Sequence, residues 1–204
     1  GPPDRNPMIH MPFGLAALAH MRWLNWGYQT EAEPGLMNRR LYWPRGRVLG
    51  GSSSINAMIY MRGHPQDYFD WASAAGPDWD WPRVRQIFKD LEDNQSLTDD
   101  HHGQGGPLTV SDLAQPNPLS RAFVQAGLEC QFPVNPDFNG ADQTGVGLYQ
   151  VTQKHGQRFS AAKAFLDPVR GRANLTVLTG AQVHRVRLDG NRATGVELRD
   201  RVLA

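Results

Sequence analysis

The sequence has little cysteine, no excess of charge of either sign and no long hydrophobic run. Its single cysteine, Cys130, excludes an internal disulfide and a zinc site built from cysteines, and it favours a reducing compartment. Lysine and arginine number 21 and aspartate and glutamate 20, so the net charge of +1 gives no electrostatic basis for binding nucleic acid. No apolar stretch approaches the roughly 20 residues of a transmembrane helix, and we expect no integral membrane segment.

The remaining composition is typical of a globular protein. Hydrophobic residues make up 40% of the 204 residues and charged residues 20%, which provides enough apolar surface to offset the entropy of the chain. We expect a cytoplasmic protein, with peripheral association with a membrane left open. Because the chain begins with Gly1 and has no recognisable targeting peptide, we expect it to be part of a longer protein.

Caps, turns and spacing predict a mixture of helices and strands. Apolar residues at helical spacing behind a capping residue or proline predict helices at 65–76, 80–91, 117–126 and 160–168. Alternating and β-branched runs predict strands at 175–179, 183–188 and 193–198, with a turn at 189–191 that makes the end of the chain a β-meander. The predicted fold class is therefore α/β, or α+β by content.

Residues 45–60 contain the most informative pattern, a glycine pair followed by three serines. Gly50 and Gly51 allow a backbone to approach a ligand closely, and serines are good N-cap residues. We predict a helix here, with an apolar face formed by Ile55, Met58 and Ile59. The amide groups and dipole of such a helix start favour phosphate, and two nearby arginines, Arg45 and Arg47, add positive charge. The alternative is a glycine turn before an ordinary capped helix.

The histidines and serines give no independent sign of a metal or hydrolase site. His101 and His102 are the only adjacent histidines, and side chains adjacent in sequence point apart on regular structure, so we interpret them as part of a solvated loop and predict no metal. The G-x-S-x-G pattern of hydrolases is absent, so the three serines are interpreted as caps or cofactor contacts rather than nucleophiles.

Residues 46–63, GRVLGGSSSINAMIYMRG, closely resemble the first signature of the glucose-methanol-choline (GMC) oxidoreductases, in particular the choline and alcohol dehydrogenase branch. Further similar runs cover nearly the whole chain, at 25–31, 38–40, 67–71, 137–140, 156–162, 174–177 and 193–197. The resemblance implies an FAD/NAD(P)-binding fold with part of a GMC substrate-binding domain. Three parts are then expected: an FAD-binding portion at 1–103, a substrate-domain portion with a return helix at 104–172, and an FAD-binding β-meander at 173–204.

The resemblance also implies a set of FAD contacts. The residues expected to line the cofactor or to lie along the flavin and its ribityl chain are Val48, Gly50, Gly51, Ser52, Asn56, Ala57, Met58 and Ile59. Val183 is expected to meet the adenine end through its backbone. Some relatives carry a histidine covalently joined to the flavin where this chain has Ile55, which has no nucleophilic atom. We therefore expect FAD to be bound noncovalently.

By the same resemblance, the parent protein oxidises a primary alcohol, such as choline or an aliphatic or aromatic alcohol, to an aldehyde by hydride transfer to FAD. The chain lacks the G-x-G-x-x-G turn that grips the ADP pyrophosphate. The family's catalytic histidine is expected outside this chain, so no catalytic residue is assigned and the fragment alone is expected to be inactive. The substrate and the electron acceptor stay open. The alternative is a non-catalytic domain that binds an anion or is purely structural.

Overall fold

The computed structural model describes residues 1–203. Its α-helices are α1 (Pro7–His10), α2 (Leu15–Leu18), α3 (Pro65–Ala75), α4 (Trp81–Leu91) and α5 (Pro118–Glu129). Short 3-10 helices lie at Pro12–Gly14, Pro34–Leu36, Gly51–Ser54, Pro77–Trp79 and Asp167–Val169, and a π-helix at Ala162–Leu166. The strands are β1 (Tyr28–Gln29), β2 (Tyr42–Trp43), β3 (Glu92–Asn94), β4 (Leu108–Val110), β5 (Gln153–Lys154), β6 (Gln157–Arg158), β7 (Val183–Asp189), β8 (Arg192–Leu198) and β9 (Val202–Leu203).

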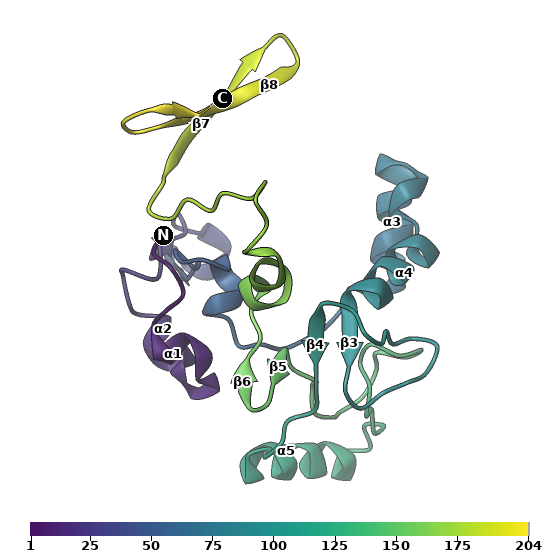
Figure 1. Cartoon of the computed structure of the whole chain (residues 1–204). Coiled ribbons are helices and arrows are strands. Elements are labelled where there is room, and N and C mark those ends of the chain that lie inside the picture. The colour runs from purple at the N-terminus through teal and green to yellow at the C-terminus, as the bar shows by residue number, and fades with distance from the viewer. Residues whose placement is uncertain (204) are drawn as a thin grey trace.

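The strands form small separate sheets. Strands β1 and β2, and β5 and β6, make antiparallel pairs, and β3 pairs with β4 in parallel. Strands β7, β8 and β9 form an antiparallel meander, whose long β7–β8 hairpin projects from the rest of the molecule (Figure 1). The sequence predicts this hairpin but not β9. The predicted strand at 175–179 is wrong, because residues 175–178 have no regular secondary structure and residue 179 lies in a bend. The mixture of helix and strand confirms the predicted fold class.

The helices predicted at 65–76, 80–91 and 117–126 are confirmed as α3, α4 and α5. The Asp80 side chain accepts a hydrogen bond from Trp81 N at 2.9 Å and begins α4, and the Asn117 side chain accepts from Leu119 N at 2.9 Å and begins α5. Helix α3 begins with a capping box formed by His64 and Asp67, and it ends at Gly76, whose φ of 109° suits a residue without a side chain. Helices α3 and α4 lie side by side, away from α1 and α2 (Figure 1).

The predicted helix at 160–168 is correct in place but wrong in type and end. Ser160 O accepts from Ala164 N at 2.9 Å, after which the chain follows the π-helix instead of an α-helix. Pro168 does not end the helical stretch. It lies in the first turn of the next 3-10 helix, where the missing N–H of proline costs no hydrogen bond.

One hydrophobic core lies beside the glycine-rich segment. It is formed by Ile9, Leu18, Leu24, Val48 and Ile55, each no more than 7% exposed. Two of these residues, Val48 and Ile55, stand on either side of Gly50 and Gly51. The core therefore anchors both ends of the glycine turn.

Helix α5 has an uncovered apolar face. Its helical spacing is as predicted, yet Leu119 is 78% exposed and Phe123 is 74% exposed.

Every helix in the described part of the chain is too short or too polar to cross a bilayer.

The glycine-rich connector at 103–107 packs closely on the end of α4. Gly103 N donates to Glu92 Oε2 and Gly106 N donates to Glu92 O, both at 3.0 Å. The expected division of the chain into 1–103, 104–172 and 173–204 stays a prediction, and residue 204 lies outside the described residues.

Candidate functional site

The glycine–serine loop, which we define as residues 46–59, contains a tight turn rather than the start of an α-helix. Gly50 and Gly51 both have left-handed backbones, with φ of 85° and 58°. Gly51 N donates to Val48 O at 2.8 Å, so this amide is already used within the turn. Only one turn of 3-10 helix follows, at Gly51–Ser54. The predicted helix with an apolar face formed by Ile55, Met58 and Ile59 is therefore wrong, whereas phosphate binding at this loop stays a prediction.

The chain leaves the 3-10 helix because Asn56 makes its own turn. The Asn56 side chain accepts from Met58 N at 3.0 Å, which is the Asx-turn geometry that competes with a helix. Met58 has a positive φ of 63° and donates no helical hydrogen bond, and Met58 O accepts from Thr152 N at 2.8 Å. Ile55 and Met58 are buried as expected, whereas Ile59 is 51% exposed.

The two glycines have different physical requirements. A Cβ on Gly50 would collide with Ser54 Oγ and lie 3.2 Å from the Ala162 Cβ, so packing against the π-helix requires glycine at this position. A Cβ on Gly51 would meet nothing within 4 Å. Gly51 therefore presents bare backbone to open space, which suits the close approach of a ligand, whereas Gly50 serves the turn itself.

The three serines tie the loop together. Ser52 Oγ accepts from Gly46 N at 3.1 Å, and Ser54 Oγ donates to Leu49 O at 2.8 Å. Ser53 Oγ donates to Gly50 O at 2.6 Å and accepts from Ala161 N at 2.9 Å. Each hydroxyl is therefore engaged with the backbone, which agrees with their interpretation as structural or cofactor-contact residues.

The expected cofactor residues divide into buried and exposed groups. The Val48 side chain belongs to the core, so it has only its backbone to offer to a ligand. Ser52, Asn56 and Ala57 are exposed, and Gly50 and Gly51 are partly exposed. The guanidinium groups of Arg45 and Arg47 lie 5.1 Å above the rings of Trp43 and Trp26, where cation–π contact holds them.

An apolar groove of about 640 Å³ runs beside the end of the glycine–serine loop. Ala57, Met58 and Ile59 form one wall, and Leu119 and Phe123 of α5 contribute to the other. The groove adjoins the 57–59 end of the loop and not the glycine pair. It provides an open apolar surface next to the residues expected to line the flavin.

The segment before Val183 approaches the other end of the loop. Gly180 N donates to Gly1 O at 2.7 Å, and the backbone of Gly1 packs against Arg47. Val177 and Thr179 line a polar pocket of about 420 Å³ together with Leu49. Val183 itself is 50% exposed at the base of the β7–β8 hairpin, and its expected contact with adenine stays a prediction.

Arg158 is the functional candidate that spacing and composition did not reveal. It is fully buried, and its Nη1 donates to Ser53 O at 3.1 Å, to Asn56 O at 2.7 Å and to Asn56 Oδ1 at 2.8 Å. Its position within the 156–162 run that resembles the family was the one available signal. The side chain links β6 to the glycine–serine loop across about 100 positions of sequence.

A buried charged cluster forms around Arg62, which follows the glycine–serine loop in sequence. Arg62 forms an ion pair with Glu92, whose other oxygen accepts from His102 Nδ1 at 3.0 Å. His102 Nε2 donates to Asp137 Oδ2 at 3.0 Å, and Asn94 Nδ2 donates to Glu92 Oε1 at 2.8 Å. The interpretation of His102 as part of a solvated loop is wrong, because two carboxylates distant in sequence enclose it.

Hydrogen bonding decides the protonation of this cluster. Burial opposes the charged form of His102, but its hydrogen bonds to Glu92 and Asp137 raise the pKa above 6.5. Burial likewise opposes the charged form of Glu92, but hydrogen bonds from His102, Asn94 and the Gly103 amide hold its pKa below 4.5. Asp99 brings a third potential metal ligand near His102 and Asp137, yet both ring nitrogens of His102 are occupied by carboxylates. The prediction of no metal stays a prediction.

Comparison with known proteins identifies the family. The sequence profile of the GMC oxidoreductases matches residues 14–202. The chain belongs to the GMC oxidoreductase family. Among curated relatives of this family, it is 53% identical to an alcohol dehydrogenase [acceptor] of Pseudomonas putida over 197 residues, 96% of this chain and 36% of the relative. An oxygen-dependent choline dehydrogenase of Brucella anthropi is 41% identical over 97% of this chain and 36% of the relative.

Solved structures of GMC-type enzymes have the same fold. Pyridoxine 4-oxidase from Mesorbium loti is 40% identical, with a TM-score of 0.90 over 97% of this chain and 39% of that chain. An FAD-dependent oxidoreductase from Chaetomium thermophilum is 27% identical, with a TM-score of 0.85 over 97% of this chain and 36% of that chain. The chain therefore spans somewhat more than a third of the length of the relatives it matches.

FAD is the cofactor of this family, and the glycine–serine loop fits it. The decisive feature is Gly51, whose backbone is left-handed and open where a side chain would stand. Asn56 and Ala57 are exposed on the same loop, and the apolar groove begins beside them. The assignment of individual contacts to Val48, Gly50, Gly51, Ser52, Asn56, Ala57, Met58, Ile59 and Val183 stays a prediction.

Proposed function

We propose that the full-length protein oxidises a primary alcohol to an aldehyde with FAD. The observation that carries this proposal is the open, left-handed Gly51 in a loop that belongs to the GMC family. The names of the relatives add support, since one is an alcohol dehydrogenase and another a choline dehydrogenase. When bound, FAD would accept a hydride from the alcohol carbon.

The residues of this chain would bind and orient the reactants. Gly51 would let the cofactor approach the backbone, while the serine hydrogen bonds hold the turn in shape. Ala57, Met58 and Ile59 would lie between the flavin and the apolar groove, which would exclude water from the reacting carbon. The group that removes the hydroxyl proton would come from outside this chain.

We further propose that FAD is held noncovalently. Ile55 stands at the position where some relatives carry a histidine covalently joined to the flavin. Its side chain is 4% exposed and packs in the core. An alkyl side chain offers no atom that bonds to the flavin.

The proposed three-part division at 103/104 and 172/173 would separate two FAD-binding portions from a substrate-binding portion.

Anaerobic mixing of the purified full-length protein with candidate alcohols tests the function. The protein should be yellow, and its flavin absorption should bleach with choline, an aliphatic alcohol or an aromatic alcohol, with release of the aldehyde. The electron acceptor is then found by measuring reoxidation with oxygen and with quinones. A colourless protein would favour the alternative of a non-catalytic domain, and a yellow protein that no alcohol reduces would refute alcohol oxidation alone.

A further inference from the structure

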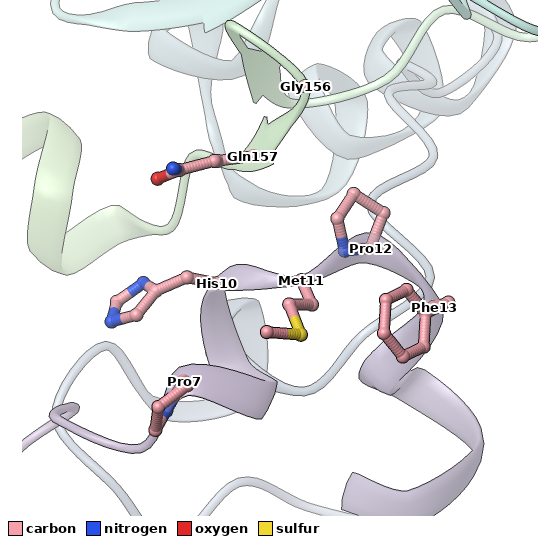
Figure 2. A pocket seen from close by; sticks show the side chains of 7 residues that line it. All are labelled: Pro7, His10, Met11, Pro12, Phe13, Gly156 and Gln157. Atoms are coloured by element: carbon pink, nitrogen blue, oxygen red, sulfur yellow. The ribbon is translucent and has the colours of Figure 1, made fainter.

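Arg158 is a fully buried arginine that joins segments distant in sequence. Its Nε donates to Ile9 O of α1 at 2.8 Å, and its Nη1 donates to the carbonyl oxygens of Ser53 and Asn56. A cavity of about 420 Å³ lies between the β5–β6 hairpin and α1. Figure 2 shows Gln157 and His10 on opposite sides of it. Next to this cavity, the hydrogen bond from Arg158 to Ile9 joins the hairpin to α1.

The backbone around Arg158 is held firmly in place. Residue Arg158 pairs with Gln153 in the β5–β6 hairpin, and Phe159 N donates to Thr152 O at 2.9 Å. Thr152 N in turn donates to Met58 O at 2.8 Å, so the hairpin is attached to the end of the glycine–serine loop. The guanidinium group therefore reaches the loop from a rigid base, with a fixed direction.

The charge of Arg158 has no partner among residues 1–203. No carboxylate there forms an ion pair with it, and its Nη2 is buried without a hydrogen-bond acceptor. Burial lowers the pKa of Arg158 to about 10, which still leaves it charged at neutral pH. A buried unpaired charge is costly to a fold. The other buried arginine, Arg62, also has one nitrogen without an acceptor, its Nε, but its charge is paired with Glu92.

We propose that Arg158 is a positioning residue for FAD, which fixes the carbonyl groups of Ser53 and Asn56 and so holds the glycine–serine loop in the shape that accepts the cofactor. Without it, the carbonyl groups of Ser53 and Asn56 would be free to turn, because no other side chain among the described residues bonds to these two oxygens, and Asn56 Oδ1 would keep only its hydrogen bond from Met58 N. The open backbone of Gly51 and the exposed side chain of Asn56 would then no longer be held in fixed positions relative to each other. The inference rests on FAD binding and does not depend on which alcohol is oxidised.

The test compares three variants of the full-length protein after removal of FAD. Arg158→Met removes the charge and all the hydrogen bonds while filling similar space, and Arg158→Lys keeps a charge and one or two donors. Arg62→Met is the matched control, since it removes another buried arginine, whose guanidinium group bonds to His101 O and Glu92 and not to the loop. We expect the FAD Kd to rise about 100-fold or more in Arg158→Met, which loses every charge-assisted hydrogen bond to the loop. In Arg158→Lys, which keeps one or two of these bonds, the Kd should rise about tenfold. Arg62→Met should lower the melting temperature and leave the FAD Kd within about threefold.

The pH dependence of FAD binding separates positioning from simple space filling. A buried lysine has a lowered pKa, so FAD binding by Arg158→Lys should weaken between about pH 7 and pH 9 as the lysine loses its proton, whereas wild type stays constant. If Arg158→Met fails to fold, Arg158→Lys decides the question by its Kd and this pH profile. A folded Arg158→Met apoprotein that binds FAD like wild type would overturn the proposal, as would equal loss of affinity in Arg62→Met. A wild-type protein that lacks FAD would instead refute the proposed function.

Discussion

Replacement of Gly51 by alanine separates the role of a cofactor site from that of a simple turn. Gly51 has a φ of 58°, and an added Cβ would meet nothing within 4 Å. The substitution therefore adds only backbone strain, of about 1–2 kcal/mol for an L-residue in the left-handed region, which is partly offset by the lower entropy of the unfolded chain. A net loss of about 1 kcal/mol lowers the melting temperature of a domain of this size by about 2–4 °C.

Gly190→Ala is the matched control for this strain. Gly190 has a φ of 55°, and an added Cβ there would also meet nothing within 4 Å, but it lies in the β7–β8 turn. The two variants should therefore melt at similar temperatures as apoproteins. If FAD occupies the space before Gly51, the new methyl group stands in its place, and Gly51→Ala alone should lose FAD affinity by at least about tenfold, or about 1.4 kcal/mol.

The measurement is the FAD Kd of both apoproteins by quenching of flavin fluorescence, together with their melting curves. Gly50→Ala adds a third comparison, because a collision with Ser54 and Ala162 should destabilise the protein whether or not FAD is present. Equal FAD affinity in Gly51→Ala, Gly190→Ala and wild type would refute the reasoning. The open space before Gly51 would then be ordinary solvent.

Three further outcomes follow from the structure. Acid precipitation of the yellow full-length protein should release the flavin into the supernatant, because Ile55 offers no bonding atom, and flavin that stays in the pellet would contradict noncovalent binding. The free energy of unfolding should decrease as the pH falls below about 4.5, because Glu92, whose pKa is lowered in the fold, then loses its hydrogen-bonded charge. It should also decrease as the pH rises above about 6.5, because the protonated His102, whose two ring N–H groups donate to Glu92 and Asp137, then loses one of these protons. In His102→Gln the decrease in the free energy of unfolding at rising pH should disappear. If denaturation curves of this variant still show the decrease, other groups cause it. In the isolated chain, Phe123→Ser should reduce binding of a hydrophobic dye while changing stability by less than about 0.5 kcal/mol, since Phe123 is 74% exposed, and a large drop in melting temperature would contradict that exposure.

Elements with local signals could be predicted from the sequence. Helices α4 and α5 begin at Asp80 and Asn117, whose side chains cap the helix within two residues, and the β7–β8 turn forms at Gly190. Each of these features depends on residues that are close neighbours in the chain. Their physical cause can therefore be read before any tertiary contact is known.

The glycine–serine loop could not be predicted in the same way. Residues 51–59 satisfy the rules for a capped amphipathic helix, but Arg158 bonds to Ser53 and Asn56, and Thr152 bonds to Met58. These partners are about 100 positions away, so local propensity yields to tertiary contacts. The cluster around His102 escaped prediction for the same reason, because Asp137 is 35 positions away.

The link between Ser53 and Arg158 also has a consequence for protein synthesis. A separation of 105 residues, at about 5–20 residues per second, means that the ribosome adds Arg158 about 5–20 s after Ser53. During this interval the loop has its glycines, serines and core residues but not the arginine that holds its carbonyl groups. We therefore expect the nascent loop to remain accessible to chaperones during this interval. It should bind FAD only after the β5–β6 hairpin has left the ribosome.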